Sequence, residues 1–284
     1  MDKKIKKSKI KNQNCGIRQW RMIFLFLFLF SILLSGCAVQ KRSCPPLKTM
    51  AEAAAVLKEY SAALKPFKAT GNCLLSYTNE KKEVFSLSFP VRVWFDNPAK
   101  FCIYGDVMFD SKGVCFAVDG DKYWTYAKPY GVYITGKNET DNFKIEDNFF
   151  SSRVLLDFIE PFGWGCGEIV MENSKDNRNV MTCSGEDGCK WKKISIDRCD
   201  RLIRKIEYLN CTKEPVLVVE LDEYKNISGG KDILFPYKLI YKHIEKRNSM
   251  QIKLDSVKLW EASDQQLKAL FAGPDANDFK KEAK

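Results

Sequence analysis

The chain of 284 residues contains a single histidine, His243, and this scarcity argues against most of the common catalytic sites. A Ser-His-Asp or Cys-His site needs a histidine next to a nucleophile, and no GxSxG elbow accompanies this one. His243 lies in phase with Leu239 and Tyr241 on an expected strand, which is typical of a structural residue. Phosphate loops of the GxxxxGK type and CxxC pairs are also absent. We therefore expect no enzyme, no catalytic residue, no metal and no cofactor.

Positive charge is scarcer than the whole-chain value suggests. The formal net charge is +10, but residues 1–36 hold eight lysines and arginines against Asp2 alone, a net of +7 that leaves +3 for the rest. Phosphate binding needs a clustered excess of Lys and Arg, so nucleic acid is not an expected partner. A glycosidase pair needs two facing carboxylates, and the acidic candidates fall in expected turns and solvent-facing positions, so a cell-surface hydrolase is the least favoured class. These candidates are Asp110, Asp119, Asp121, Glu220, Asp222 and Glu223.

A basic leader and a short apolar run precede Cys37. The run from Met22 to Leu34 is shorter than the roughly 20 residues that a membrane-spanning helix needs. Basic residues, an apolar run and small residues follow one another in the order of a secretion signal. The sequence Leu34-Ser35-Gly36-Cys37 resembles the bacterial lipobox. That resemblance implies that residues 1–36 are a lipoprotein signal peptide and that Cys37 becomes the diacylated N-terminus; the alternative is a signal anchor that stays uncut.

Nine cysteines remain once Cys15 leaves with the leader and Cys37 is acylated. Because nine is odd, at least one of them stays free or pairs between chains. Those in expected strands pack as small core residues. Cys183 and Cys189 flank a short loop and face each other if it closes a hairpin, which leaves a disulfide there open. The nine are Cys44, Cys73, Cys102, Cys115, Cys166, Cys183, Cys189, Cys199 and Cys211.

The rest of the chain reads as a tether, one domain and a tail. Residues 37–48 are expected to be a lipidated tether, because Cys44-Pro45-Pro46 blocks regular structure. A helix is predicted over 49–64, with Thr49 as its cap. Residues 49–272 are expected to form the domain, and 273–284 a disordered tail.

From Phe67 the apolar pattern changes to period two, which predicts short antiparallel strands joined by turns such as Asp119-Gly120. Two further helical segments are predicted, at 151–160 and from Ser263-Asp264. The predicted strands are 85–95, 101–107, 113–118, 123–126, 130–135, 178–183, 190–196, 202–209, 216–224, 233–244 and 249–260.

Aromatic residues are abundant, and some predicted strands are apolar on both faces. In 233–244, Phe235, Tyr237 and Leu239 alternate with Leu234 and Ile240, which are apolar as well. One face is then covered by helices or forms an apolar pocket. A large sheet core and a concavity for a lipid or acyl chain both fit this pattern.

The order of these motifs resembles the lipoprotein carrier and acceptor proteins of the LolA/LolB type, over roughly residues 50–271. The resemblance implies a mainly β (α+β) fold, a curved antiparallel half-barrel with helices covering the concave face. It rests on the leading helix that ends at Leu64-Lys65-Pro66-Phe67, on residues 89–94 with Asn97-Pro98, on residues 118–126, on the helix at 151–160 and on the closing strand at 254–257.

The resemblance also implies a function. It suggests an outer-membrane lipoprotein on the periplasmic side, anchored in the membrane through its N-terminal lipid, that binds acyl chains of lipoproteins or lipids as a monomer. The helix at 151–160 is expected at the mouth of the cavity, with Phe158 partly open to water. The alternative is a non-catalytic cell-envelope scaffold or protein-docking lipoprotein. The expected wall consists of Phe89, Val91, Trp94, Trp124, Leu155, Phe158, Leu239 and Leu254; one residue of register would turn any strand's choice to the other face.

Overall fold

The computed structural model describes the part of the chain that follows the predicted leader. One compact unit begins at Cys44. The predicted signal peptide, Cys37, most of the tether and nearly all of the tail lie outside the described residues. The described residues are 44–78, 82–97, 99–108, 110–128, 132–137, 154–155, 157–159, 161, 168–173, 176–184 and 190–273.

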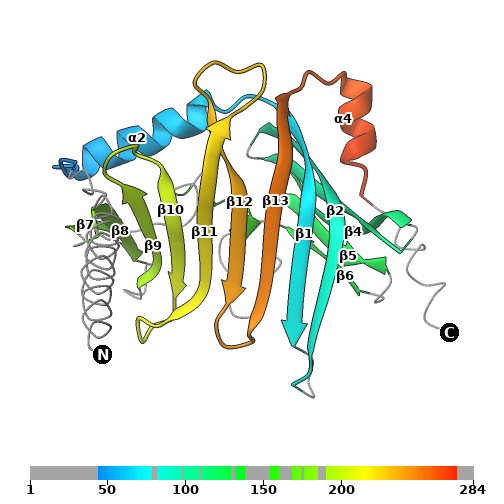
Figure 1. Ribbon diagram of the computed structural model, residues 1–284, viewed down its shortest axis with the longest axis horizontal. Coiled ribbons are helices and arrows are strands. Elements are labelled where there is room, and N and C mark those ends of the chain that lie inside the picture. Colours follow the sequence, from blue (N-terminus) through cyan, green and yellow to red (C-terminus); the bar gives the residue numbers. More distant parts are fainter. Residues whose placement is uncertain are drawn as a thin grey trace, which may run out of the picture. The chain divides into compact units, whose positions relative to one another are not determined.

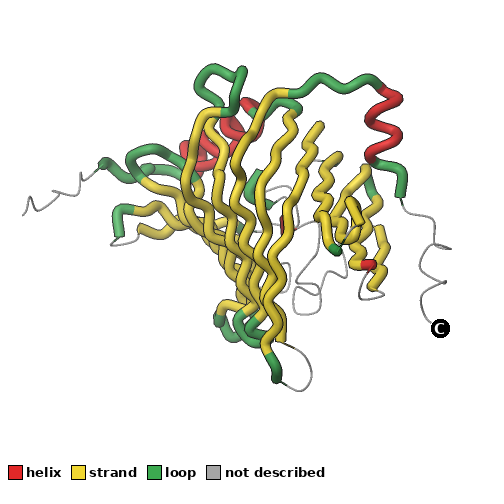
Figure 2. The backbone as a smooth tube through the Cα atoms, turned by 45° about the vertical axis from the view of Figure 1, so that its right-hand side comes forward, coloured by secondary structure: helices red, strands yellow, loops and turns green. Residues whose placement is uncertain are grey.

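Thirteen strands in the described part form a single antiparallel sheet, which is bent and does not close (Figures 1 and 2). Strands that follow one another in sequence pair as neighbours, with one exception. The sixth and seventh strands do not pair but lie at opposite edges, and the first strand pairs with the last in the middle of the sheet. The predicted curved, mainly β architecture is confirmed.

The strands agree with most of the predicted runs, and β7 is an addition that the sequence pattern did not indicate. In chain order they are β1 Phe67–Thr78, β2 Val84–Asn97, β3 Lys100–Val107, β4 Asp110–Asp119, β5 Lys122–Ala127, β6 Val132–Lys137, β7 Ile169–Asn173, β8 Arg178–Ser184, β9 Lys190–Asp197, β10 Ile203–Leu209, β11 Pro215–Asn226, β12 Leu234–His243 and β13 Asn248–Leu259.

Two helices frame the sheet. Helix α2, Met50–Ala63, begins at the predicted cap, where the Thr49 hydroxyl accepts a hydrogen bond from the Glu52 N–H at 3.2 Å. Helix α4, Asp264–Leu270, has a capping box between Ser263 and Gln266. Neither helix is long and apolar enough to cross a membrane, as far as the chain is described. The predicted helix at 151–160 is described only in part, with Val154 and Leu155 helical and residues 157–159 in a turn.

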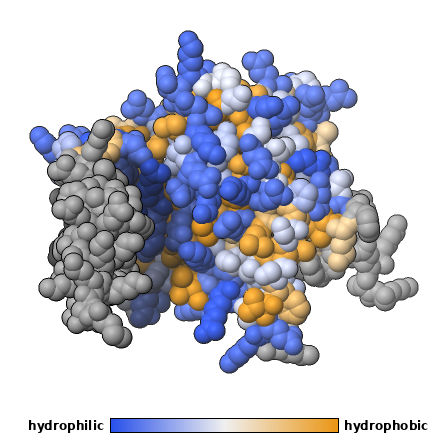
Figure 3. Space-filling model, in the orientation of Figure 1, coloured by the Kyte–Doolittle hydropathy of each residue, from blue (hydrophilic) through white to orange (hydrophobic). Residues whose placement is uncertain are grey.

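Side chains on the two faces of the sheet enter two separate hydrophobic clusters. The larger cluster lies on what we call the inner face, where the sheet packs against Ala53 and Leu57 of α2. The smaller one lies on the outer face of β2–β6, where Phe271 at the end of α4 covers it. Strand β3 is buried on both sides because Ile103 enters the inner cluster and Cys102 the outer one. Helix α2 covers the inner face, in agreement with the predicted architecture, whereas α4 lies against the outer face. Where β11, β12 and β13 face the viewer, the surface is mainly hydrophilic (Figure 3).

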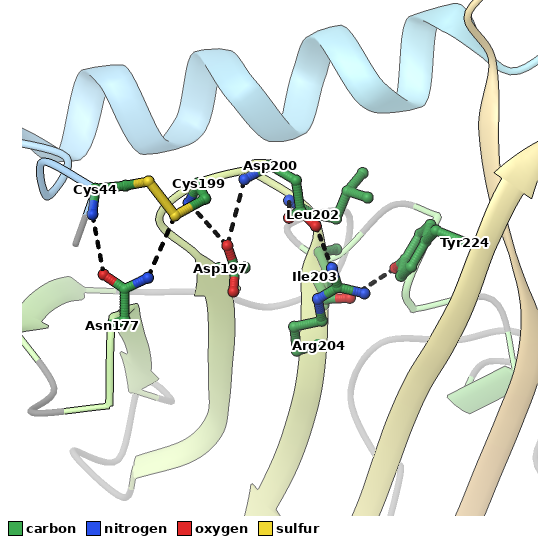
Figure 4. A network of polar contacts seen from close by, with 9 residues as sticks. All are labelled: Cys44, Asn177, Asp197, Cys199, Asp200, Leu202, Ile203, Arg204 and Tyr224. Atoms are coloured by element: carbon green, nitrogen blue, oxygen red, sulfur yellow. Dashed lines mark hydrogen bonds and ion pairs between the residues drawn. A yellow bond between two sulfur atoms is a disulfide. The ribbon is translucent and has the colours of Figure 1, made fainter. Parts of the chain in front are cut away.

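A disulfide between Cys44 and Cys199 fixes the start of the compact unit to the turn between β9 and β10 (Figure 4). Their Cα atoms lie 5.1 Å apart, although 155 positions separate them in sequence. Asn177 lies between the two, since its side chain accepts from the Cys44 N–H and donates to the Cys199 sulfur, both at 3.4 Å.

Other cysteines fall into two groups. Cys183 and Cys211 are also disulfide-bonded. Cys189, which the sequence offered as a partner for Cys183, lies outside the described residues, so that pairing stays a prediction. Cys73, Cys102 and Cys115 are free thiols, all buried in the sheet as expected.

Candidate functional site

The inner face of the sheet holds a short piece of chain between β6 and β7, which we call the inserted segment (Val154, Leu155, residues 157–159 and Pro161). Its apolar side chains are buried, and the Phe158 ring is only 2% exposed. That ring packs edge-on against Phe235 of β12, with the ring centroids 5.7 Å apart. The inserted segment is therefore part of the core and covers the strands beneath it.

A buried ion pair joins the inserted segment to the sheet. The Lys192 ammonium of β9 lies 2.8 Å from Asp157 Oδ2, and the two side chains are 0% and 4% exposed. The same ammonium donates a hydrogen bond to the Pro161 carbonyl at 2.8 Å. Tyr208 of β10 donates its hydroxyl to the same Asp157 oxygen. Lys192 and Tyr208 are direct cross-strand partners, so both side chains reach the inner face from one point of the sheet.

Further hydrogen bonds attach the inserted segment on its other sides. The Tyr241 hydroxyl of β12 donates to the Leu155 carbonyl at 3.4 Å, and Ser61 of α2 donates to the Ile159 carbonyl. Burial, together with the negative charge of Asp157, raises the pKa of Tyr241 far above its ordinary value, so this hydroxyl keeps its proton. Asp157 Oδ1, in contrast, is buried with no hydrogen-bond partner among the described residues.

The eight predicted wall residues do not form one wall. Six of them belong to the inner cluster: Phe89, Val91, Leu155, Phe158, Leu239 and Leu254. Trp94 and Trp124 instead belong to the outer cluster, beside Tyr104 and under α4. In β2, Val93 and Phe95 enter the inner cluster, so Trp94 between them points to the opposite face. Placing the two tryptophans on the concave wall was wrong.

The position expected for Phe158 also needs correction. A residue at the mouth would be partly exposed, whereas Phe158 lies inside the inner cluster. The spacing of Val154, Leu155, Phe158 and Ile159 identified an apolar face correctly, but that face packs fully against the sheet.

Sequence reasoning missed the two charged residues of the buried ion pair. A signal for Lys192 was present, because it lies in phase with Ile194 and Ile196, which are both core residues of β9. A lysine at a core position of a strand is rare and marks a buried partner. Asp157 has no such signal, since it only interrupts a short apolar helix pattern.

The residues considered for catalysis do not converge. His243 is buried, and its Nδ1 accepts a hydrogen bond from the Lys246 N–H at 3.2 Å. Among the carboxylates, Asp110 pairs with Lys128 at 2.8 Å and Glu220 with Lys242 at 2.9 Å, both near the surface. No group of three metal-binding side chains occurs among the residues described.

Comparisons with known proteins bear on the fold. No protein-family model matches the sequence, and no curated protein matches it either. A domain from Vibrio parahaemolyticus assigned to outer-membrane lipoprotein sorting covers 82% of this chain and 98% of its own, with a TM-score of 0.52 and 15% identity. A DUF1329 family protein from Desulfovibrio piger covers 78% and 98%, with a TM-score of 0.53 and 13% identity. A LolA superfamily protein from Nitrosomonas europaea covers 76% of this chain and 96% of its own, with a TM-score of 0.48 and 11% identity. The likeness to the lipoprotein-sorting domain and to the DUF1329 protein shows a shared fold, and the predicted resemblance is confirmed at that level.

Proposed function

We propose that this protein is a cell-envelope lipoprotein that binds an acyl chain or lipid on the inner face of its sheet. The observation that carries the proposal is the inserted segment, which lays apolar side chains across an apolar sheet face and is attached to that face by side-chain hydrogen bonds. An acyl chain can replace such a segment because both offer the sheet mainly hydrocarbon surface. The fold shared with a lipoprotein-sorting domain supports the same function.

The proposed binding wall differs from the predicted one. It keeps Phe89, Val91, Leu239 and Leu254 and loses both tryptophans. Leu155 and Phe158 become the groups that the acyl chain replaces.

We also propose anchoring through Cys37 and residence at the periplasmic side of the outer membrane, as a monomer. Disulfide-bonded Cys44, Cys199, Cys183 and Cys211 support an exported protein, because disulfides persist in oxidising compartments. The Ala38 that follows the lipidated cysteine favours the outer membrane, since in the best-known systems an Asp there retains lipoproteins in the inner one. Delivery of lipoproteins is the corresponding role.

Titration with the fluorescent fatty acid dansyl-undecanoic acid tests the binding function. We expect saturable binding by the wild type and tighter binding by Phe158→Ala, because loss of the ring leaves apolar space next to Phe235. The same change should cost about 3–5 kcal/mol of stability, as buried Phe to Ala changes do.

Phe85→Ala is the matched control, because Phe85 of β2 is 43% exposed and belongs to neither hydrophobic cluster. Its probe affinity should equal that of the wild type. Absence of saturable binding by the folded wild type and by folded Phe158→Ala would favour the scaffold alternative.

A further inference from the structure

The buried ion pair restricts which ligand can replace the inserted segment. Lys192 is fully buried on a face that is otherwise lined by apolar side chains such as Ile194 and Ile196. A buried ammonium is tolerated only when an acceptor or a counter-charge stays next to it. Two such groups, the Asp157 carboxylate and the Pro161 carbonyl, both belong to the inserted segment. A ligand that displaces the segment therefore takes away both.

Asp157 is an imperfect partner for this site. One of its oxygens is bonded to Lys192 and Tyr208, but the other is buried without a hydrogen-bond partner among the described residues. A buried carboxylate oxygen without a partner loses its hydration and gains nothing in return. The unpartnered oxygen therefore reduces what Asp157 contributes to the stability of this pair.

We propose that the ligand is an anionic amphiphile whose head group replaces Asp157 as the counter-ion of Lys192. This inference rests on the proposed function. The head group accepts hydrogen bonds from the Lys192 ammonium and the Tyr208 hydroxyl, as Asp157 does in the structure. Its tail takes the place of Leu155 and Phe158. The shared chemistry is an anionic oxygen, which a fatty acid supplies as a carboxylate and a phospholipid as a phosphate.

The sheet sets the direction of the ligand. The head-group site lies on β9 and β10, while Phe158 contacts Phe235 on β12 and Phe67 of β1 packs edge-on against the same ring. In the sheet order, β10 is followed by β11, β12, β13 and β1. A tail that begins at Lys192 thus crosses the strands toward the centre of the sheet.

Matched ligands test the head group. Palmitate is compared with hexadecanol, and dipalmitoyl phosphatidate with dipalmitoylglycerol, by competition against the bound dansyl probe. For the wild type we expect the anionic member of at least one pair to bind about tenfold more tightly or better, the factor that a hydrogen bond to a charged group supplies. The pair that shows the difference identifies the head group.

The double variant Asp157→Asn/Lys192→Met removes both charges and so avoids an unpaired buried ion. Its preference for the anionic member should disappear, with the affinity for the neutral member kept. The control is Glu172→Gln/Lys193→Met. It removes an ion pair near the surface, between Glu172 of β7 and Lys193 of β9. That pair is 3.9 Å apart, with side chains 46% and 35% exposed, and its loss should leave the preference intact.

The single variant Asp157→Asn gives an independent measurement. It leaves Lys192 without its carboxylate, so palmitate should raise its melting temperature more than that of the wild type. An equal rise would overturn the inference, as would equal binding of anionic and neutral ligands by the wild type. In both cases binding itself, and hence the proposed function, stands. If no ligand with a tail binds, the proposed function fails together with the inference.

Discussion

Burial changes the ionisation of single side chains on the inner face, and Cys73 of β1 shows this directly. Its thiol is 2% exposed within the inner cluster. Burial raises the pKa of Cys73 from its ordinary 9.0 to about 12. The folded protein therefore keeps this thiol neutral at pH values at which the unfolded chain has lost the proton.

The raised pKa of Cys73 predicts a loss of stability in alkali. The contribution of the Cys73 thiol to the free energy of unfolding is complete below pH 9. It is lost as the pH rises from 9 to about 12, because the unfolded state binds fewer protons than the folded state in this range. Between these pH values the free energy of unfolding falls by up to about 1.4 kcal/mol per pH unit. Urea unfolding at pH 8, 9, 10 and 11 measures it. Lysines and tyrosines titrate in the same range, so the test is the difference from Cys73→Ala, which should decline less steeply. Parallel declines would contradict the prediction.

Predicting single residues from the sequence worked where burial alone decides and failed where orientation decides. All eight predicted wall residues lie in or against a hydrophobic cluster. Trp94 was nevertheless assigned to the wrong face, because side chains alternate and the pattern of β2 is apolar on both sides near Phe95. The partner of Lys192 was beyond reach, since only the fold brings Asp157 to β9.

At the scale of elements, helix α4 is held to the outer face by few contacts. None of its own residues is buried. Phe271 just after it enters the outer cluster, and the Tyr104 hydroxyl of β3 donates to the Leu270 carbonyl at 2.8 Å. Beneath it lie the free thiols of Cys102 and Cys115, and burial raises the pKa of Cys102 well above its ordinary value.

Phe271→Ala should detach α4 locally without unfolding the sheet, because local opening needs less free energy than global unfolding. Alkylation by N-ethylmaleimide of Cys102 and Cys115 should then become faster, while that of Cys73 on the inner face stays slow. Mass spectrometry distinguishes the thiols by their tryptic peptides. Gln265→Ala, at an exposed position of α4, is the control and should behave as the wild type. Equal alkylation rates in both variants would show that α4 does not protect these thiols.

Most elements followed from sequence period and caps. The helix at 49–64 was predicted within a residue or two, since Thr49 and Pro66 mark its ends. Strand β7 was missed because five residues at a sheet edge, one of them the exposed Val170, give too short an alternation. The segment at 151–160 was identified as apolar, but its insertion into the core depends on long-range partners.

At the scale of the whole molecule, the order of the strands in the sheet could not be predicted from the sequence. A meander of neighbouring strands was predictable, but the pairing of β1 with β13 joins the two ends of the domain. The disulfide between Cys44 and Cys199 could not be predicted either, because spacing alone does not fix which cysteines pair. The family resemblance supplied the curvature that the pattern itself did not.

Anchoring is also a property of the whole molecule. Cys37→Ser should release the protein from the membrane or leave it as an uncleaved precursor, because two acyl chains provide the firm attachment. Membrane fractionation and the mass of the N-terminal peptide measure this. Cys15→Ser, which lies within the predicted leader, should change neither. A Cys37→Ser protein that is cleaved and still fractionates with membranes would refute the proposed anchor.

The disulfide between Cys44 and Cys199 has a mechanical consequence. Tension on the chain ahead of Cys44 passes through the sulfur bridge to the turn between β9 and β10. Helix α2 begins six residues later, at Met50, so it lies off the path of the force. Traction from a tether therefore loads the broad sheet and spares the helix that packs on its inner face.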